Sequence, residues 1–381
     1  QKINNNEKVR IFSGFFCFGE KKKFDLTDTF YLKKLKYFVM LSGVLRISLC
    51  GTAELPDMVC IRSGNISYLC QASEKNNKFK AFVRIYEKVR VDNAALAKEC
   101  YAVVVSSAMP PVKEMLEIWK DCGVKYVATR SIGYEYMDVP LIESMGMHAA
   151  HTTYSPASVA DFAIMLMLMV TRNMKIVERR YEAHDFREAK LPGKELWNMT
   201  VGVVGTGAIG EMTAKHLHGF GCRMLAYSRT KRESLDGIVT YTDLDTLLAE
   251  SDVVTLHMAS TPETFHLLNA ERLAKMKKGA YLVNTARGNL IDTKALIEAL
   301  ESGHLAGAAL DVMENETGIY YTNHMYEPIS NHELAILDYM PNVIVTQHMA
   351  YYTREAGLDT MENLVKGCLH DYRGEENPWR I

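Results

Sequence analysis

Short apolar runs alternate with amphipathic stretches along the chain after residue 57, a pattern typical of strands and helices that follow one another in an α/β fold. In the first part of this pattern, strands are predicted at 58–61, 81–86, 101–106 and 125–129, and helices near 67–78 and at 112–121. Strands that are joined by helices usually run parallel. This part of the chain therefore predicts a first parallel sheet.

A second alternating series begins at Met199. Its strands are predicted at 200–204, 223–227, 253–257, 280–284 and 307–312, and its helices at 211–219, 244–250, 270–276 and 294–302. This order predicts a doubly wound dinucleotide-binding fold. An almost wholly apolar stretch, 157–171, precedes it and predicts a helix that is buried on most sides, between domains or between subunits. One strand from Val343 and a closing helix at 354–372 complete the pattern.

Length, charge and cysteine spacing narrow the class of protein. A chain of 381 residues is long enough for two domains. A net charge of -2 gives no field that would gather nucleic acid, so no nucleic-acid partner is expected. The apolar stretch at 37–45 is too short for a membrane helix and lies too far from residue 1 for a signal peptide, so no membrane partner is expected either. Eight cysteines without CxxC spacing favour reduced thiols in the cytoplasm.

A glycine motif follows the first strand of the second series. The sequence Gly205-Thr-Gly207-Ala208-Ile209-Gly210 closes an apolar run and opens a helix, which is the context in which this spacing binds a dinucleotide. Gly205 permits a tight turn, Gly207 lets the backbone approach a pyrophosphate, and Gly210 allows helix and strand to pack closely. The N–H groups at the helix N-terminus then bind the phosphates.

The residues after the second strand of this series select the cofactor. An acidic residue there binds the 2′-hydroxyl of NAD, whereas small and basic residues accommodate the 2′-phosphate of NADP. This chain has Ser228, Arg229, Lys231 and Arg232. We therefore expect NAD or NADP as cofactor, with NADPH used at least as well as NADH; the alternative is a solvated basic loop.

Three further motifs follow strands at the edge where such folds bind ligands: Arg287-Gly288, the acidic segment from Asp311 to Glu316, and Gln347-His348. With these motifs the chain resembles the D-isomer-specific 2-hydroxyacid dehydrogenases, and within that family the D-lactate dehydrogenases associated with vancomycin resistance. The resemblance covers about 58–372 and is also carried by GVKYVATRSIG (123–133), YSPASVAD (154–161), HDFR (184–187) and VGVVGTG (201–207).

The resemblance implies a domain organisation. The implied organisation consists of two Rossmann-like domains with doubly wound parallel sheets. The dinucleotide-binding domain is expected at 153–345, and a flavodoxin-like, discontinuous substrate domain at 58–152 and 346–381. Residues 1–57 match nothing in the family, and Met58 stands where a family chain would start. We therefore expect 1–57 to be an extension or a translation artefact.

The resemblance also implies three catalytic residues. His348 is the acid/base that protonates the carbonyl oxygen, Glu316 binds the other ring nitrogen and favours the imidazolium, and Arg287 holds the substrate carboxylate. This chemistry requires no metal.

Substrate and cofactor contacts follow from the same resemblance. The backbone N–H groups of Ile132 and Gly133 match a carboxylate-binding loop, and Tyr154 matches a substrate-side tyrosine. Asp311 matches a residue near the nicotinamide end of the cofactor. Tyr351 matches an aromatic wall of the side-chain pocket, which favours a small substituent such as methyl. The implied reaction is reduction of a small 2-keto acid, with pyruvate favoured, by a homodimer.

One departure and several alternatives qualify this interpretation. The residue before the catalytic histidine is usually proline in the family, and here it is Gln347, which could alter the loop that presents His348. Branched or aromatic 2-keto acids stay open as substrates, and phosphorylated ones are disfavoured because no extra basic cluster is seen. A nicotinamide-sensing corepressor is the alternative from another class. His151, His184 and His257 are expected to be structural or peripheral.

Overall fold

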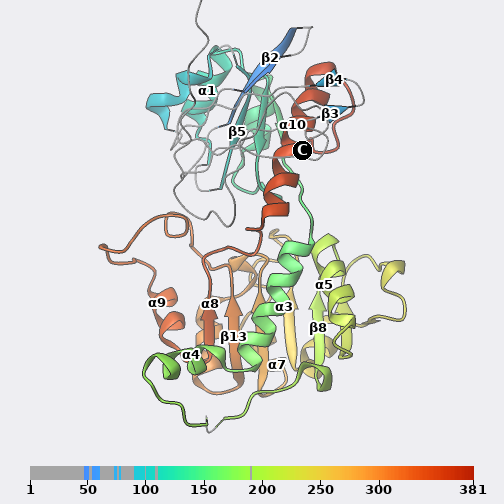
Figure 1. Ribbon diagram of the computed structural model, residues 1–381, viewed down its shortest axis with the longest axis vertical. Helices are drawn as coiled ribbons and strands as arrows, with labels where there is room; N and C mark the ends of the chain where they lie inside the picture. The colour runs from blue at the N-terminus through green and yellow to red at the C-terminus, as the bar shows by residue number, and fades with distance from the viewer. Residues whose placement is uncertain are drawn as a thin grey trace, which may run out of the picture. The chain divides into compact units, whose positions relative to one another are not determined.

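The computed structural model describes residues 47–50, 54–60, 73–74, 77–78, 90–98, 100–107, 110–188 and 191–381. Within these ranges two main sheets, each built mostly of parallel strands, are covered by helices (Figure 1). The predicted α/β class is therefore confirmed.

The first sheet has the order β1-β2-β5-β6-β7. Its strands are β1 (Ile47–Cys50), β2 (Glu54–Cys60), β5 (Cys100–Val105), β6 (Tyr126–Thr129) and β7 (His148–Ala150). All neighbours are parallel except β1, which pairs antiparallel with β2. The first sheet therefore includes residues before Met58, which the sequence assigned to the extension. A 3₁₀ helix, η1 (Val91–Ala97), and helices α1 (Lys113–Asp121) and α2 (Val139–Ser144) accompany it.

The helix predicted near 67–78 is wrong where the structure describes that segment. Strands β3 (Ser73–Glu74) and β4 (Asn77–Lys78) form an antiparallel pair there. Asparagine favours turns over helix interiors, and this stretch contains two in succession, Asn76 and Asn77. The rest of the predicted helix and the strand predicted at 81–86 lie outside the described residues.

The second sheet has seven parallel strands in the order β10-β9-β8-β11-β12-β13-β14. They are β8 (Thr200–Val204), β9 (Arg223–Tyr227), β10 (Thr240–Tyr241), β11 (Val253–Leu256), β12 (Ala280–Asn284), β13 (Leu305–Leu310) and β14 (Val343–Val345). In chain order this is 3-2-1-4-5-6-7, whose first six positions match the Rossmann arrangement. The predicted dinucleotide-binding fold is confirmed.

Helices cover both faces of the second sheet because its strands are apolar on both sides. Leu282 of β12 belongs to a core cluster formed with α6, α7, α8 and α9, whereas Tyr281 and Val283 belong to a cluster formed with α3 and α5. The helices are α3 (Ala157–Thr171), α4 (Met174–Glu182), α5 (Ala208–His218), α6 (Leu244–Glu250), α7 (Ala270–Lys275), α8 (Thr293–Glu301) and α9 (His332–Tyr339). Short 3₁₀ turns are η2 (Leu196–Asn198), η3 (Glu233–Leu235) and η4 (Gly288–Leu290).

Helix α3 is the long apolar helix that the sequence predicted. It contacts α5, β12 and β13, and most of its residues are buried, whereas Met165 is 40% exposed. Among the described residues, no single helix is both long and apolar enough for a membrane span. Helices α3 and α4 meet that test of length and composition only together, as a pair bent by 66°.

The closing helix, α10 (Arg354–Arg373), packs against the first sheet beside β6. Asp371 of this helix accepts hydrogen bonds from Tyr101 (2.7 Å) and is paired with His148 (2.6 Å). The C-terminal segment then forms a bridge between Arg380 and Ala150 of β7. These contacts support the expected discontinuous substrate domain, 58–152 with 346–381. We propose this division, extended at its start to include β1 and β2 from Ile47, together with a dinucleotide-binding domain at 153–345.

Candidate active site

The glycine motif lies between β8 and α5. Gly205 has a φ of 97°, a conformation that residues with a side chain rarely adopt. A Cβ atom at Gly210 would collide with the carbonyl oxygen of Gly205, so glycine is needed for close packing there. A Cβ atom at Gly207 would meet nothing within 4 Å. The turn is therefore open, and no side chain caps the helix N-terminus at Ala208 and Ile209. This arrangement fits a dinucleotide pyrophosphate.

The end of β9 lies beside this turn, because Tyr227 accepts a hydrogen bond from the N–H of Gly205 (2.7 Å). Ser228 is the next residue and is half-buried, and Arg229 is exposed. Within the described ranges, the Arg229 side chain makes no hydrogen bond or ion pair. A hydrogen bond with Thr261 is the main cause of the lowered pKa of Glu263, and the nearby charge of Arg229 contributes to it. Ser228 and Arg229 are therefore placed next to the cofactor turn.

The other two basic residues of this loop have structural contacts. Nε of Arg232 donates to the carbonyl oxygen of Thr206 (3.2 Å), which lies inside the glycine motif. Nζ of Lys231 lies over the ring of Tyr241, 5.7 Å from its centroid. Arg229 is thus the basic side chain of this loop that is most available to a ligand.

The histidine and glutamate that were expected to act together lie in contact. His348 follows β14 and Glu316 follows β13, and these two strands are neighbours in the sheet. Nδ1 of His348 is 2.6 Å from Oε1 of Glu316. Oε2 of Glu316 accepts a hydrogen bond from the backbone N–H of Met313 (2.9 Å), which fixes the carboxylate. Since Glu316 engages Nδ1, Nε2 is the ring nitrogen left to exchange a proton with a ligand.

Asp311 is fully buried and binds the loop that carries His348. Its carboxylate accepts hydrogen bonds from Thr346 Oγ1 (2.6 Å) and from the N–H groups of Met349 (2.8 Å) and Ala350 (2.9 Å). Its carbonyl oxygen accepts the N–H of His348 (2.7 Å). The contact with the nicotinamide that the sequence led us to expect stays a prediction, and the structure adds a role in holding this loop.

The backbone at His348 is in the left-handed region, with a φ of 56°, which is uncommon for a residue with a side chain. Such conformations persist where the surrounding contacts fix them. Here Asp311 holds the segment on both sides, and the hydroxyl of Tyr321 donates to the carbonyl oxygen of His348 (2.8 Å). Gln347 is exposed. These contacts present His348 without a proline at position 347.

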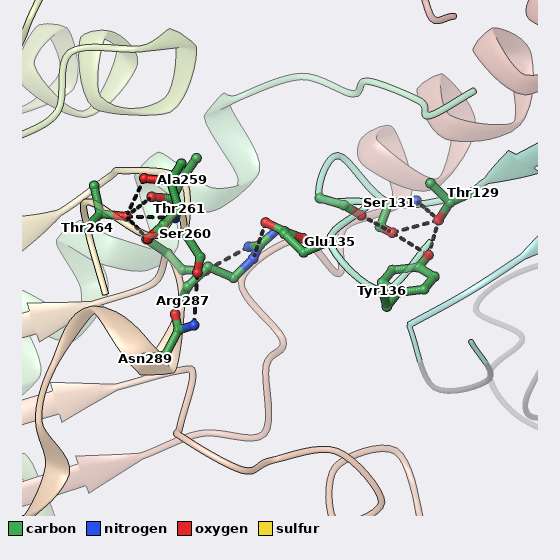
Figure 2. A network of polar contacts seen from close by, with 12 residues as sticks. Thr129, Ser131, Glu135, Tyr136, Ala259, Ser260, Thr261, Thr264, Arg287 and Asn289 are labelled. Carbon is green, nitrogen blue, oxygen red and sulfur yellow. Dashed lines mark hydrogen bonds and ion pairs between the residues drawn. The ribbon is translucent and has the colours of Figure 1, made fainter. Parts of the chain in front are cut away.

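Arg287 follows β12 and points toward the loop after β6. Figure 2 shows its guanidinium beside the carboxylate of Glu135. Nε of Arg287 is 3.2 Å from Oε1 of Glu135, and Nη1 donates to the carbonyl oxygen of Ala286 (2.7 Å). Nη2 lies against Gly133, where any Cβ atom would collide with it. The structure therefore brings together the arginine and the loop that the sequence assigned to the substrate carboxylate.

Three hydroxyl groups shape this loop, and the sequence did not single them out. Ser131 Oγ donates to the carbonyl oxygen of Gly133 (2.8 Å) and lies 3.0 Å from the hydroxyl of Tyr136, which also contacts Thr129 Oγ1 (Figure 2). Burial raises the pKa of Tyr136, so its hydroxyl stays neutral. In the described part of the chain, the N–H groups of Ile132 and Gly133 take part in no hydrogen bond. They are available to an anion.

Two tyrosines connect these parts of the site. The rings of Tyr154 and Tyr351 are 6.4 Å apart, and the ring of Tyr351 is 6.4 Å from that of His348. Burial raises the pKa of Tyr154 to about 12, and the nearby charge of Arg287 acts in the opposite direction. The ring contacts and the nearby charge therefore link four side chains in one site: Tyr154, Tyr351, Arg287 and His348.

Within the described residues, the histidines expected to be structural or peripheral make no hydrogen bond or ring contact with His348 or Glu316. Burial lowers the pKa of His257 to about 4, and its Nε2 lies 3.0 Å from Thr255 Oγ1. Burial also lowers the pKa of His151. His184 stacks on Phe186, with ring centroids 6.0 Å apart. In the segments that the structure describes, no group of three or more His, Cys, Asp or Glu side chains could hold a metal ion.

Comparisons with known proteins agree with this geometry. Residues 164–350 match the family model described as "D-isomer specific 2-hydroxyacid dehydrogenase, NAD binding domain". The chain is 48% identical over 258 residues to a D-specific alpha-keto acid dehydrogenase of Enterococcus faecium, which covers 68% of this chain and 79% of the relative. It is 41% identical over 252 residues to an aromatic 2-oxoacid reductase of Clostridium sporogenes, covering 66% and 76% respectively.

A solved structure has a similar fold. A D-lactate dehydrogenase from Treponema pallidum aligns with a TM-score of 0.73 at 33% identity. The alignment covers 78% of this chain and 91% of that chain.

Proposed function

Because the chain belongs to the D-isomer-specific 2-hydroxyacid dehydrogenases, we propose that it reduces a small 2-keto acid to the D-2-hydroxy acid with NADH or NADPH, and that pyruvate is the favoured substrate. The observation that carries this proposal is the 2.6 Å contact between His348 and Glu316, in one environment with Arg287. A proton donor, its charge partner and a cation for a carboxylate are the groups that keto-acid reduction needs.

His348 is the proposed catalytic acid. Nε2 of His348 donates a proton to the carbonyl oxygen as the keto group is reduced, and Glu316 stabilises the charged ring through Nδ1. When bound, the nicotinamide supplies the hydride. The fixed carboxylate of Glu316 and the hydrogen bonds to Asp311 hold the ring in place before the substrate arrives, which reduces the cost of orienting it.

Arg287 and the loop at Ile132 and Gly133 form the proposed site for the substrate carboxylate. The guanidinium provides two parallel N–H groups, and the free backbone N–H groups of the loop supply further donors. A carboxylate bound between them places the keto group within reach of the acid. Tyr154 keeps its proton, because its pKa is raised to about 12, and can donate a hydrogen bond to the same substrate.

Substrate size is the least constrained part of the proposal. Tyr351, whose ring lies 6.4 Å from that of Tyr154, is the proposed wall of the side-chain pocket and favours a small substituent. The relatives in Enterococcus faecium and Clostridium sporogenes are named for alpha-keto acids and for aromatic 2-oxoacids. Reduction of a larger 2-keto acid is therefore the alternative within the same reaction class.

Steady-state oxidation of NADH and NADPH at 340 nm tests this proposal. Pyruvate, 2-ketobutyrate, 2-ketoisocaproate and phenylpyruvate present increasing side chains to the same carboxylate site. We expect the highest kcat/KM with pyruvate or 2-ketobutyrate. A maximum at phenylpyruvate would support the larger-substrate alternative, and absence of turnover with all four while the cofactor binds would favour a nicotinamide-sensing role.

We propose that Arg229 binds the 2′-phosphate of NADP, because within the described ranges it is the basic residue after β9 without a hydrogen bond, ion pair or cation–π contact. Replacing Arg229 with alanine is expected to raise KM for NADPH roughly tenfold, since one hydrogen bond to a charged group contributes about 1.5 kcal/mol. KM for NADH is expected to change less than about twofold. Arg223, at the opposite end of β9 and paired with Glu250 at 2.7 Å, provides a matched control, Arg223→Ala. Equal losses with NADH and NADPH would contradict this role.

We also propose a homodimer. Its interface is an apolar groove on the helices that cover one face of the second sheet. The groove is lined by residues of α3, α4 and α5 and of the turn after α5. Met165, Val177 and Phe220 are among them, and each is at least 40% exposed. Exposed apolar patches of this kind usually mark contact surfaces. Light scattering is expected to give about twice the 43.1 kDa mass of one chain, and a monomer at micromolar concentration would contradict the proposal.

The cytoplasm is the proposed location of this reaction. Cys122 and Cys222 are free thiols, which suits a reducing compartment. Fractionation of cells that express the protein is expected to recover it with cytoplasmic enzymes. Recovery outside the cell would contradict this location.

A further inference from the structure

The carboxylate of Glu135 occupies the place that the proposed function assigns to the substrate carboxylate. It lies beside the guanidinium of Arg287, which itself lies against Gly133 (Figure 2). Oε1 of Glu135 is 3.2 Å from Nε of Arg287, and its Oε2 lies 2.6 Å from the point where a Cβ atom of Gly133 would stand. An acidic side chain of the protein itself is thus seated at a site built for an anion.

The guanidinium has a limited number of positions for a carboxylate. One N–H of Nη1 already donates to the carbonyl oxygen of Ala286 (2.7 Å), and the two-pronged contact proposed for the substrate uses the edge formed by Nε and Nη2. Nη2 faces Gly133, and Nε is engaged by Glu135. A substrate carboxylate that uses this edge must therefore displace Glu135.

The Glu135 side chain can also move away from Arg287. The side chain of Glu135 is 43% exposed and that of Arg287 is 32% exposed, so the ion pair is partly solvated. Within the described residues, the Glu135 carboxylate has no hydrogen-bond partner other than Arg287. The hydroxyl groups of Ser131 and Tyr136 hold the backbone of the loop that carries Glu135. The Glu135 side chain can therefore change its rotamer without a change in the loop.

We propose that Glu135 is an internal competitor that sets the affinity of this site for the substrate carboxylate. The inference rests on the proposed function, because it takes Arg287 and the loop at Gly133 as the carboxylate site. In the absence of substrate, Glu135 neutralises Arg287. Binding of a 2-keto acid breaks this ion pair, and part of the binding free energy is used to do so.

Removal of the Glu135 charge is therefore expected to tighten binding of a monocarboxylate. The probe is oxamate, a non-reacting carboxylate with the shape of pyruvate, titrated into the protein–NADH complex by calorimetry. Partly exposed ion pairs are weak, so the dissociation constant for oxamate is expected to fall about two- to five-fold in Glu135→Gln. Glu135→Ala is expected to give the same direction of change. KM for pyruvate should fall by a similar factor and kcat should change less, because Glu135 has already left Arg287 in the substrate complex.

The matched control is Glu143→Gln, which removes the same charge from an exposed position on α2. Its oxamate affinity is expected to equal that of the wild type. An unchanged or weaker oxamate affinity in both Glu135 variants, with their thermal unfolding unchanged, would overturn the proposal. Failure of both the wild type and the variants to bind oxamate would overturn it as well.

The binding measurement separates this inference from the proposed function. If the wild type reduces keto acids but the Glu135 variants bind oxamate no more tightly, only the competitor role fails. If no keto acid is reduced while oxamate binds more tightly to the Glu135 variants, the reaction is wrong and the competition at Arg287 stands.

Discussion

Replacing His348 with alanine is expected to lower kcat for keto-acid reduction by about three orders of magnitude, since a positioned general acid contributes roughly 10²- to 10⁴-fold. The loss should appear in kcat because the proton is transferred in the chemical step. The fold is expected to survive, because the side chain is 23% exposed and water can solvate Glu316 after the change. Steady-state kinetics at saturating pyruvate measure the effect.

A control separates this effect from a general loss of histidine. His218 is exposed on α5, and His218→Ala is expected to keep kcat within about twofold of the wild type. NADH binding by the His348 variant is expected to stay unchanged, since the proposed cofactor turn lies at Gly205 to Gly210. A variant that retains more than about a tenth of the wild-type kcat would contradict the role of His348.

Replacing Arg287 with leucine is expected to lower kcat/KM by about 10²- to 10⁴-fold. Two hydrogen bonds to the substrate carboxylate are lost, and each hydrogen bond to a charged group contributes about 1.5–3 kcal/mol. Loss of the cation also leaves Glu135 without its partner in the described structure. Most of the change should appear in KM, and it is measured with pyruvate at fixed, saturating NADH.

Two further variants give this prediction its controls. Arg287→Lys keeps the charge but lacks the planar fork, so it should recover only part of the loss. Arg223→Leu removes an arginine that forms an exposed ion pair with Glu250, and its kcat/KM should equal that of the wild type. Wild-type KM in Arg287→Leu would show that the carboxylate binds elsewhere.

The second sheet could be predicted from sequence almost element by element. Its strands are short apolar runs bounded by polar turns, and both faces are buried, so the signal is strong over 200–204 and 280–284. The glycine spacing also located the open turn at Gly207, because the function of this turn depends on local backbone geometry. Helix α9 was missed because its apolar residues form no clear stripe, although Asn331 caps its N-terminus. Helix α4 was missed because it has no side-chain cap and no buried residue.

Contacts between distant segments could not be predicted in the same way. The ion pair of Glu135 with Arg287 joins loops that are 152 residues apart, and the hydrogen bond of Tyr321 to His348 depends on a loop in an uncommon conformation. Neither follows from periodicity or from a motif. Two tyrosines in succession at 320 and 321 were a weak signal that a polar aromatic group lies near the acidic segment.

The N-terminal part of the first sheet shows a different limit. The apolar run after Met58 suggested that the first strand starts there, whereas β2 begins at Glu54 and pairs with β1 at Ile47–Cys50. Glu54, Pro56 and Asp57 interrupt the apolar pattern and hid the start of the strand. The predicted start of the strand was therefore the residue at which hydrophobicity rises. Backbone pairing begins at an earlier residue.

The proposed reaction is tested most directly by chiral chromatography of the product that the purified protein forms from pyruvate and reduced nicotinamide. D-Lactate should appear in an amount equal to the cofactor oxidised, and it should be absent with His348→Ala over the same time. L-Lactate as the product, or oxidation of the cofactor without lactate, would contradict a D-2-hydroxyacid dehydrogenase that acts through His348.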